Sequence, residues 1–145
     1  MPTFPSVEWF EAIREVVTRD GRLEKLGTCD AVVGVKVLDQ AFKITFEAFE
    51  CTGVREISVA DLAKTDFYLE TPYETWQAML ENIKEKGKPD GQYTLNTIDF
   101  LDPDGFAKSD DQSKKDSFYR YGQTFQQFFN ASSEIETVFA VPQHA

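Results

Sequence analysis

Residues 66–87, DFYLETPYETWQAMLENIKEKG, join a short strand pattern to a helix pattern, and this join decides the fold. Apolar and polar residues alternate over the first positions, which is typical of a strand with one buried face. A helix is predicted to begin at Pro72, because the Thr71 hydroxyl can accept from an early amide and proline needs no donor there. It is predicted to end at Gly87, since glycine readily adopts the left-handed conformation of helix ends. Its apolar side chains share one stripe: Tyr73, Trp76, Met79, Leu80 and Ile83.

Residues 30–50 carry two consecutive runs in which apolar residues alternate with polar ones, a pattern that predicts a β-hairpin. We predict the register that places every apolar side chain on one face. Its facing pairs are Val37 with Phe42, Val35 with Ile44 and Val33 with Phe46. The same register sets Lys36 opposite Lys43, which is a mild repulsion. Cys29 falls on the apolar face and Cys51 on the opposite one, so we expect two free thiols.

The central part of the chain is predicted to add further strands and a loop. Residues 54–59 form a third strand pattern and residues 66–70 a fourth. Residues 93–101, YTLNTIDFL, fit a helix face and also a strand. Residues 102–116, DPDGFAKSDDQSKKD, are polar and contain Gly and Pro, so they are predicted to form a mobile loop. The aspartates of this loop do not follow the EF-hand spacing, and we expect no metal site there.

Two further helices are predicted near the ends of the chain. Ser6 can cap the first, which is predicted to end near Asp20 and Gly21. Its apolar stripe contains Trp9, Phe10, Ile13, Val16 and Val17. Ser113 and Asp116 resemble a capping box at the start of the second. The second helix carries five aromatic residues at helical spacing: Phe118, Tyr121, Phe125, Phe128 and Phe129. Residues 134–141 fit either a last strand or an arm.

The strand, the Thr-Pro corner and the helix with an early Trp, DFYLETPYETW at residues 66–76, resemble the sterol carrier protein family, the non-specific lipid-transfer type. The resemblance extends over about residues 30–83 in the order of elements. It implies an α+β fold in which helices cover a mixed sheet of about five strands and enclose an apolar cavity. It also implies that the protein carries a fatty acid, an acyl chain or a sterol.

Composition bounds the class of protein and its partners. The chain has 145 residues, enough for a single domain over residues 1–145. It contains 13 Phe, 5 Tyr and 2 Trp, an excess that indicates large apolar contact surfaces. The net charge of −10 disfavours nucleic acid and predicts at most transient membrane contact. We expect a cytoplasmic location, because the sequence shows no secretory leader and no membrane-spanning stretch. The oligomeric state stays open.

Three apolar surfaces are candidates for a ligand site. The hairpin would supply a floor with Phe42, Ile44 and Phe46. The helix after Pro72 would supply one wall with Trp76, Met79, Leu80 and Ile83. The aromatic helix near the C-terminus would supply a second wall or lid with Tyr121, Phe125, Phe128 and Phe129. The resemblance implies that these surfaces enclose a lipid-like molecule, whereas an ordinary packed core is the alternative.

Catalytic chemistry has little support in the sequence, and we expect a non-catalytic protein without a cofactor. The only histidine, His144, is next to the last residue, and the usual nucleotide-binding and acyl-enzyme motifs are absent. One alternative is a small cone-shaped enzyme of the ketosteroid-isomerase type, in which Asp99 or Asp66 is a buried acid with a raised pKa. Another alternative is an accessory module that binds its ligand for a partner protein.

Overall fold

The structure, a computed structural model, describes residues 2–102 and 105–139, and its central element is a five-stranded mixed sheet. The strand order is β4-β3-β2-β5-β6. The strands are β2 (Ala31–Val37), β3 (Gln40–Glu47), β4 (Glu50–Ile57), β5 (Phe67–Glu70) and β6 (Ala107–Lys108). Strand β2 pairs antiparallel with β3 and parallel with β5. The predicted α+β class with a mixed sheet is therefore confirmed.

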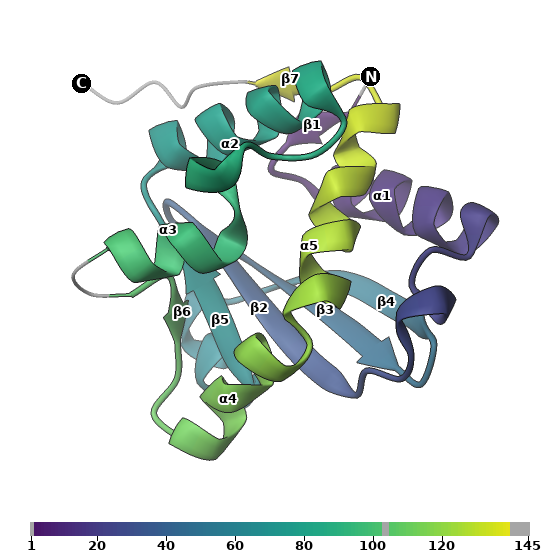
Figure 1. The fold of residues 1–145 in the computed structure, drawn as a ribbon. Helices are drawn as coiled ribbons and strands as arrows, with labels where there is room; N and C mark the ends of the chain where they lie inside the picture. Colours follow the sequence, from purple (N-terminus) through teal and green to yellow (C-terminus); the bar gives the residue numbers. More distant parts are fainter. Residues whose placement is uncertain (1, 103–104, 140–145) are drawn as a thin grey trace.

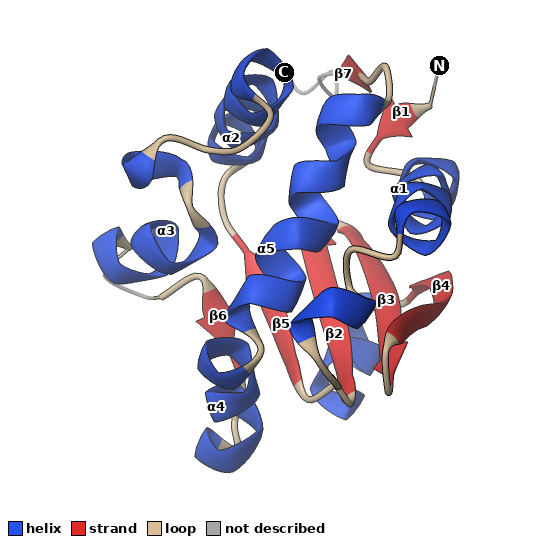
Figure 2. Ribbon diagram, turned by 45° about the vertical axis from the view of Figure 1, so that its right-hand side comes forward, coloured by secondary structure: helices blue, strands red, loops and turns tan. Residues whose placement is uncertain are grey.

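Helices cover one face of this sheet (Figure 1). They are α1 (Val7–Asp20), α2 (Tyr73–Lys86), α3 (Leu95–Leu101), α4 (Gln112–Arg120) and α5 (Gly122–Asn130). Short 3-10 turns lie between the helices and strands: η1 (Glu24–Leu26), η2 (Val59–Lys64), η3 (Gly91–Tyr93) and η4 (Ala131–Glu134). Strands β1 (Thr3–Phe4) and β7 (Val138–Phe139) pair in parallel beside the helices, which brings the two ends of the described chain together (Figure 2).

Turn η2 lies against the other face of the sheet, and Gly34 makes this close approach possible. A Cβ atom at Gly34 would lie only 2.6 Å from Leu62 Cδ2 and 2.7 Å from Tyr68 Cβ. Any larger residue would therefore push Leu62, which is 3% exposed, off the sheet.

The helix ends that the sequence marks most clearly form as predicted. The Ser6 hydroxyl accepts from the Trp9 amide at 3.1 Å and caps α1, and Gly21 ends this helix in the left-handed conformation. Gly87 ends α2 in the same way. The start of α2 differs, because Pro72 is the N-cap residue and no side chain caps the helix. The predicted capping by Thr71 is wrong, although the boundary is correct to one residue.

The hairpin register differs from the prediction by two residues. The observed pairs are Val37 with Gln40, Val35 with Phe42, Val33 with Ile44 and Ala31 with Phe46. A shift of two keeps every side chain on its predicted face, so the core face is unchanged. The shift also removes the predicted repulsion, because Lys36 now faces Ala41 and Lys43 faces Gly34. The chain turns at Leu38, which adopts a φ of 55°.

Strand β4 begins earlier than predicted, and this changes the position of Cys51. Cys51 pairs with Phe46 and is 2% exposed, so it lies on the core face rather than the opposite one. Both cysteines are free and buried, as predicted, although the geometric reason given for it was wrong. Burial raises the pKa of both thiols to about 12, which makes them packing groups rather than nucleophiles.

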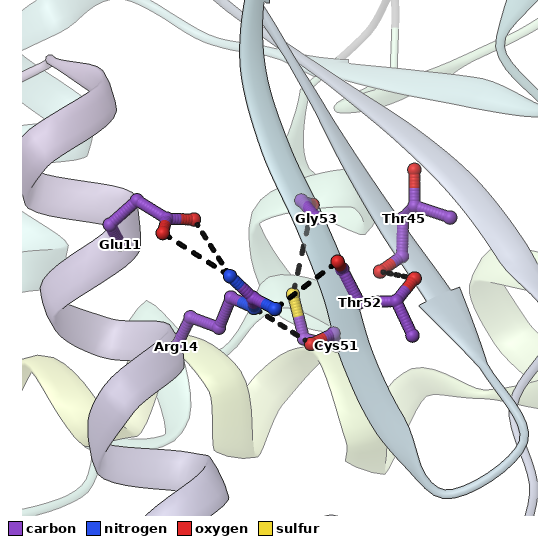
Figure 3. Close-up of polar contacts among 6 residues, drawn as sticks. All are labelled: Glu11, Arg14, Thr45, Cys51, Thr52 and Gly53. Atoms are coloured by element: carbon purple, nitrogen blue, oxygen red, sulfur yellow. Dashed lines mark hydrogen bonds and ion pairs between the residues drawn. The ribbon is translucent and has the colours of Figure 1, made fainter.

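Arg14 anchors α1 to the edge strand β4 (Figure 3). Its Nε donates to the Cys51 carbonyl at 2.9 Å, and its terminal nitrogens reach the Thr52 carbonyl and the Glu11 carboxylate, each at 3.2 Å. The pairing of β3 with β4 shifts register at this place, as in a β-bulge. Arg14 thus provides hydrogen bonds to two carbonyls of β4, which is an edge strand of the sheet among the described residues.

The segment 102–116 is not the loop that the sequence predicts. Strand β6 forms within it and completes the sheet, and Phe106 is 0% exposed. The reason lies in the preceding helix, because the Asp99 carboxylate accepts from the Phe106 and Ala107 amides. Residues 103–104 lie outside the described residues. The ambiguous segment before this one forms helix α3.

The predicted C-terminal aromatic helix is two helices. Asp111, not Ser113, caps α4, because its carboxylate accepts from the Ser113 and Lys114 amides. The helical path breaks at Tyr121, whose φ of −107° and ψ of 23° separate α4 from α5. Strand β7 accounts for part of the 134–141 segment, and residues 140–141 of it lie outside the described residues.

Candidate hydrophobic ligand site

The three predicted ligand surfaces meet in one hydrophobic core. Tyr121 is half-buried and packs against this core. The other ten residues are buried: Phe42, Ile44, Phe46, Trp76, Met79, Leu80, Ile83, Phe125, Phe128 and Phe129. Strand β3 supplies the floor, α5 packs on it through Phe125 and Phe128, and α2 packs against α5. The sequence pattern therefore identifies which side chains face the interior, whereas their role in binding stays a prediction.

Aromatic rings from the sheet and from α5 contact one another directly. The Phe46 ring centroid lies 5.4 Å from that of Phe125 and 5.5 Å from that of Phe128, and both pairs are edge-to-face. Trp76 lies 5.7 Å from Phe129, which joins α2 to α5. These side chains meet in the space that the resemblance assigns to a cavity. A ligand between them would have to part the rings.

Sequence reasoning missed several core aromatics that surround Trp76. Phe106 lies 5.2 Å from the Trp76 ring, and Phe4 lies 5.9 Å from it. Phe4 belongs to the two-residue strand β1, and Phe106 precedes the two-residue strand β6. Strands this short carry no periodic signal. The only local sign was a large apolar residue within a polar stretch.

Trp76 has a buried indole N–H that finds no hydrogen-bond acceptor among residues 2–102 and 105–139. Its side chain is 0% exposed. The second tryptophan provides a contrast, because Trp9 is equally buried and its Nε1 donates to Thr137 Oγ1 at 2.9 Å. Leaving a buried donor without an acceptor costs about 1–3 kcal/mol. Such groups are rare in native proteins and call for an explanation.

Ser132 is the second buried group of this kind. Its hydroxyl has no partner within the described part of the chain, and the residue is 3% exposed. Ser132 lines a hollow of about 300 Å³ between α2, η4 and β7. Leu80 and Phe139 line the same hollow, and exposed glutamates and Lys84 surround its rim. The hollow thus lies between solvent and the aromatic core.

A larger hollow of about 440 Å³ lies on the opposite face of the sheet. Its lining includes Lys36, Glu70 and Lys108, and Glu70 pairs with Lys36 at 2.6 Å and with Lys108 at 3.2 Å. Burial raises the pKa of Glu70, but the hydrogen bonds from the two lysines outweigh burial and hold it below its usual range. These ion pairs link β2, β5 and β6. None of the predicted ligand residues lines this hollow.

Asp99 does not have the properties of a catalytic base. Its Oδ1 accepts from the Phe106 amide at 2.7 Å and the Ala107 amide at 2.9 Å, and its Oδ2 accepts from the Tyr119 hydroxyl at 2.7 Å. Burial raises the pKa of Asp99, but these bonds outweigh burial and lower it overall. The predicted raised pKa is therefore wrong. The carboxylate holds β6 in place.

Asp66, the other carboxylate considered as a buried acid, is also hydrogen-bonded. Asp66 Oδ2 accepts from the Val32 amide at 2.8 Å, which ties β5 to the start of β2. Within the described residues there is no cluster of His, Cys, Asp and Glu that could hold a metal ion. His144 lies outside the described residues. No helix in the described ranges is both long enough and apolar enough to span a bilayer.

Comparison with known proteins identifies the fold. No family profile matches the sequence, and no curated protein matches it. Among solved structures, the chain is similar to a conserved hypothetical protein from Thermus thermophilus, whose solution structure is described as "possibly sterol carrier protein". The two share 16% identity with a TM-score of 0.59, over 92% of this chain and 90% of that one. At this identity the likeness shows the fold alone, a sterol-carrier-like α+β arrangement.

Proposed function

We propose that this protein binds and carries a hydrophobic molecule, such as a fatty acid, an acyl chain or a sterol, without reacting with it. The observation that carries the proposal is the indole N–H of Trp76, which is fully buried among Phe4, Phe106 and Phe129 and has no acceptor in the described chain. A purely structural core would place Phe there at no such cost. A ligand with a carbonyl or hydroxyl oxygen would supply the acceptor.

The surroundings of Trp76 suit an apolar ligand with one polar end. Ten of the eleven predicted residues lie on β3, α2 and α5, Tyr121 lies between α4 and α5, and all of them belong to or pack against the same hydrophobic core as Trp76. A ligand site of this type is mostly apolar and carries few polar groups that fix orientation. Trp76 and Ser132 would be those groups.

We also propose that the protein belongs to the sterol carrier family. The fold likeness supports both this proposal and the proposal of ligand carriage. The single domain, the cytoplasmic location, the transient membrane contact and the absence of nucleic-acid binding remain predictions. An accessory module that binds the same ligand for a partner protein stays the alternative. The enzyme alternative loses Asp99, its principal candidate for a base, because that carboxylate has a lowered pKa and accepts three hydrogen bonds.

The test begins with solvent extraction of the purified protein and mass spectrometry of what is released. We expect a lipid in near-stoichiometric amount. The stripped protein should then bind a fluorescent fatty-acid analogue, and Trp76→Phe should weaken this binding about fivefold, the equivalent of one hydrogen bond. Trp9→Phe is the matched control, because its N–H already has an acceptor. An empty extract together with no binding of the analogue would refute the proposal.

A further inference from the structure

We infer that the hollow between η2 and β6, on the sheet face opposite the helices, binds a small organic carboxylate. The carboxylate group would lie against Lys36 and Lys108, and the apolar body of the ligand against η2. The inference does not depend on the proposed function, because this hollow and the aromatic core lie on opposite faces of the sheet. It is carried by a lining that has a cationic side and an apolar side.

The first step is the geometry of the hollow. Turn η2 packs on the sheet at Gly34, where Leu62 and Tyr68 close on the position of the missing side chain. Strand β6 borders the same space, because Lys108 pairs with Tyr68 across the sheet. The hollow between them has a volume of about 440 Å³. This volume is within the range of small-molecule sites, about 300–1,000 Å³.

The second step is the hydrogen-bonding capacity of two lysines in the lining. Lys36 Nζ donates to Glu70 Oε2 at 2.6 Å, and Lys108 Nζ donates to Glu70 Oε1 at 3.2 Å. Within the described residues neither ammonium has another acceptor. An ammonium has three donors, so each lysine retains two. A ligand carboxylate can therefore bind beside Glu70 without displacing it.

The third step is the sign of the local charge. The lining contains three lysines, of which Lys115 is the third, against Glu70 and Asp110, so it carries a net charge of +1. The whole chain has a net charge of −10. On the same face of the sheet, Lys43 and Arg55 lie opposite each other, and within the described residues neither has an ion-pair partner. This face therefore favours an anion, and one negative charge balances the lining.

The fourth step is the apolar side of the hollow, which indicates an organic ligand rather than an inorganic ion. Turn η2 contributes Val59, Ala60 and Ala63 to the lining. Val59 is 42% exposed, an unusual exposure for a valine that borders a concave surface. An inorganic anion would leave this side in water. A ligand with an apolar body would cover it, and the area removed from water would add to the affinity.

The test compares three probes that share one ring system and differ in their polar group: 2-naphthoate, 2-naphthamide and 2-naphthylmethylamine. Each is titrated calorimetrically into the lipid-stripped wild-type protein at pH 7.5. We expect 2-naphthoate to bind at least tenfold more tightly than the neutral amide or the cationic amine, because only the carboxylate gains charge-assisted hydrogen bonds from the lysines.

Two variants should change the affinity for 2-naphthoate in opposite directions. Lys36→Gln should weaken binding about fivefold, because it removes one half-exposed charge-assisted donor. Glu70→Gln should strengthen binding about fivefold, because it removes the competing negative charge between the two lysines. Poor folding would weaken binding in both variants. Lys88→Gln is the control for net charge, because Lys88 is exposed and does not line the hollow.

Three results would overturn the inference and leave the proposed function standing. The first is 2-naphthoate binding no more tightly than 2-naphthamide, or not binding at all. The second is Glu70→Gln weakening the binding of 2-naphthoate, or Lys36→Gln binding it as well as Lys88→Gln does. The third is displacement of 2-naphthoate by the fluorescent fatty-acid analogue, which would place both in the aromatic core. Conversely, an empty solvent extract would refute the proposed function and leave this inference unaffected.

Discussion

The two fully buried tryptophans allow a matched measurement of the unpartnered indole N–H. Trp9 and Trp76 are both 0% exposed, but within the described residues only Trp9 has an acceptor, Thr137 Oγ1. Replacing either by Phe removes an N–H and a similar ring volume, so the packing losses largely cancel in the difference. Trp9→Phe loses a hydrogen bond worth about 1 kcal/mol, whereas Trp76→Phe removes a donor whose burial costs about 1–3 kcal/mol. We therefore expect Trp9→Phe to be less stable than Trp76→Phe by about 2–4 kcal/mol.

Guanidinium unfolding of the lipid-stripped variants gives the two free energies of unfolding, provided that the denaturant slopes agree. Added ligand should reduce the difference, because it supplies the acceptor to the Trp76 indole that Trp9→Phe retains and therefore stabilises that variant more than Trp76→Phe by mass action. Equal stability of the two variants, or a less stable Trp76→Phe, would refute the reasoning. In that case Trp76 has an acceptor in solution, and the main support for a polar-ended ligand disappears.

Three further predictions concern the core, the α1 anchor and acid stability. Phe125→Ala should cost about 3–5 kcal/mol in denaturant unfolding, because its ring is 1% exposed; a loss below about 2 kcal/mol would show that it borders empty space. Arg14→Lys should cost about 1 kcal/mol, because lysine keeps the charge but cannot reach both β4 carbonyls; an unchanged midpoint would contradict this. Folding lowers the pKa of Asp99. Its carboxylate therefore contributes fully to the stability of the folded state above the pKa of an unfolded-chain aspartate, about 4, and this contribution is lost as pH falls through the lower pKa of the folded state. Asp99→Ala should therefore be less stable at pH 7 and lose less stability on acidification; a curve parallel to wild type would disprove the role.

Local signals predicted the elements whose cause is local. The α1 cap at Ser6, the left-handed ends at Gly21 and Gly87, and the buried stripe of α2 each depend on residues within one or two turns. The hairpin shows where local reasoning stops, because a register shifted by two residues exposes the same faces. The Lys36–Lys43 repulsion in the predicted register was the signal against it, and the observed register avoids that pair.

Contacts between different elements explain much of what the sequence did not predict. Strand β6 forms in a polar segment because Asp99, from a different element, accepts its amides. The break at Tyr121 interrupts a stripe whose spacing fits one continuous helix. Of the candidate site, the aromatic members were predictable from periodicity, and Ser132 was not. A serine becomes buried only because η4 packs beside α2, and nothing within its own segment indicates that neighbour.

A core of touching rings is compatible with carriage when the energies are compared. Seating a chain among Phe46, Phe125, Phe128, Trp76 and Phe129 would separate three ring pairs that lie 5.4–5.7 Å apart. Such pairs are worth about 0.5–1.5 kcal/mol each beyond their buried area, so parting them costs about 3 kcal/mol. Each buried methylene of the ligand contributes about 0.8 kcal/mol, and a chain of about twelve gains roughly 10 kcal/mol. The ligand therefore offsets the opening of the core once it buries more than about four methylenes, and affinity should rise with chain length beyond that point.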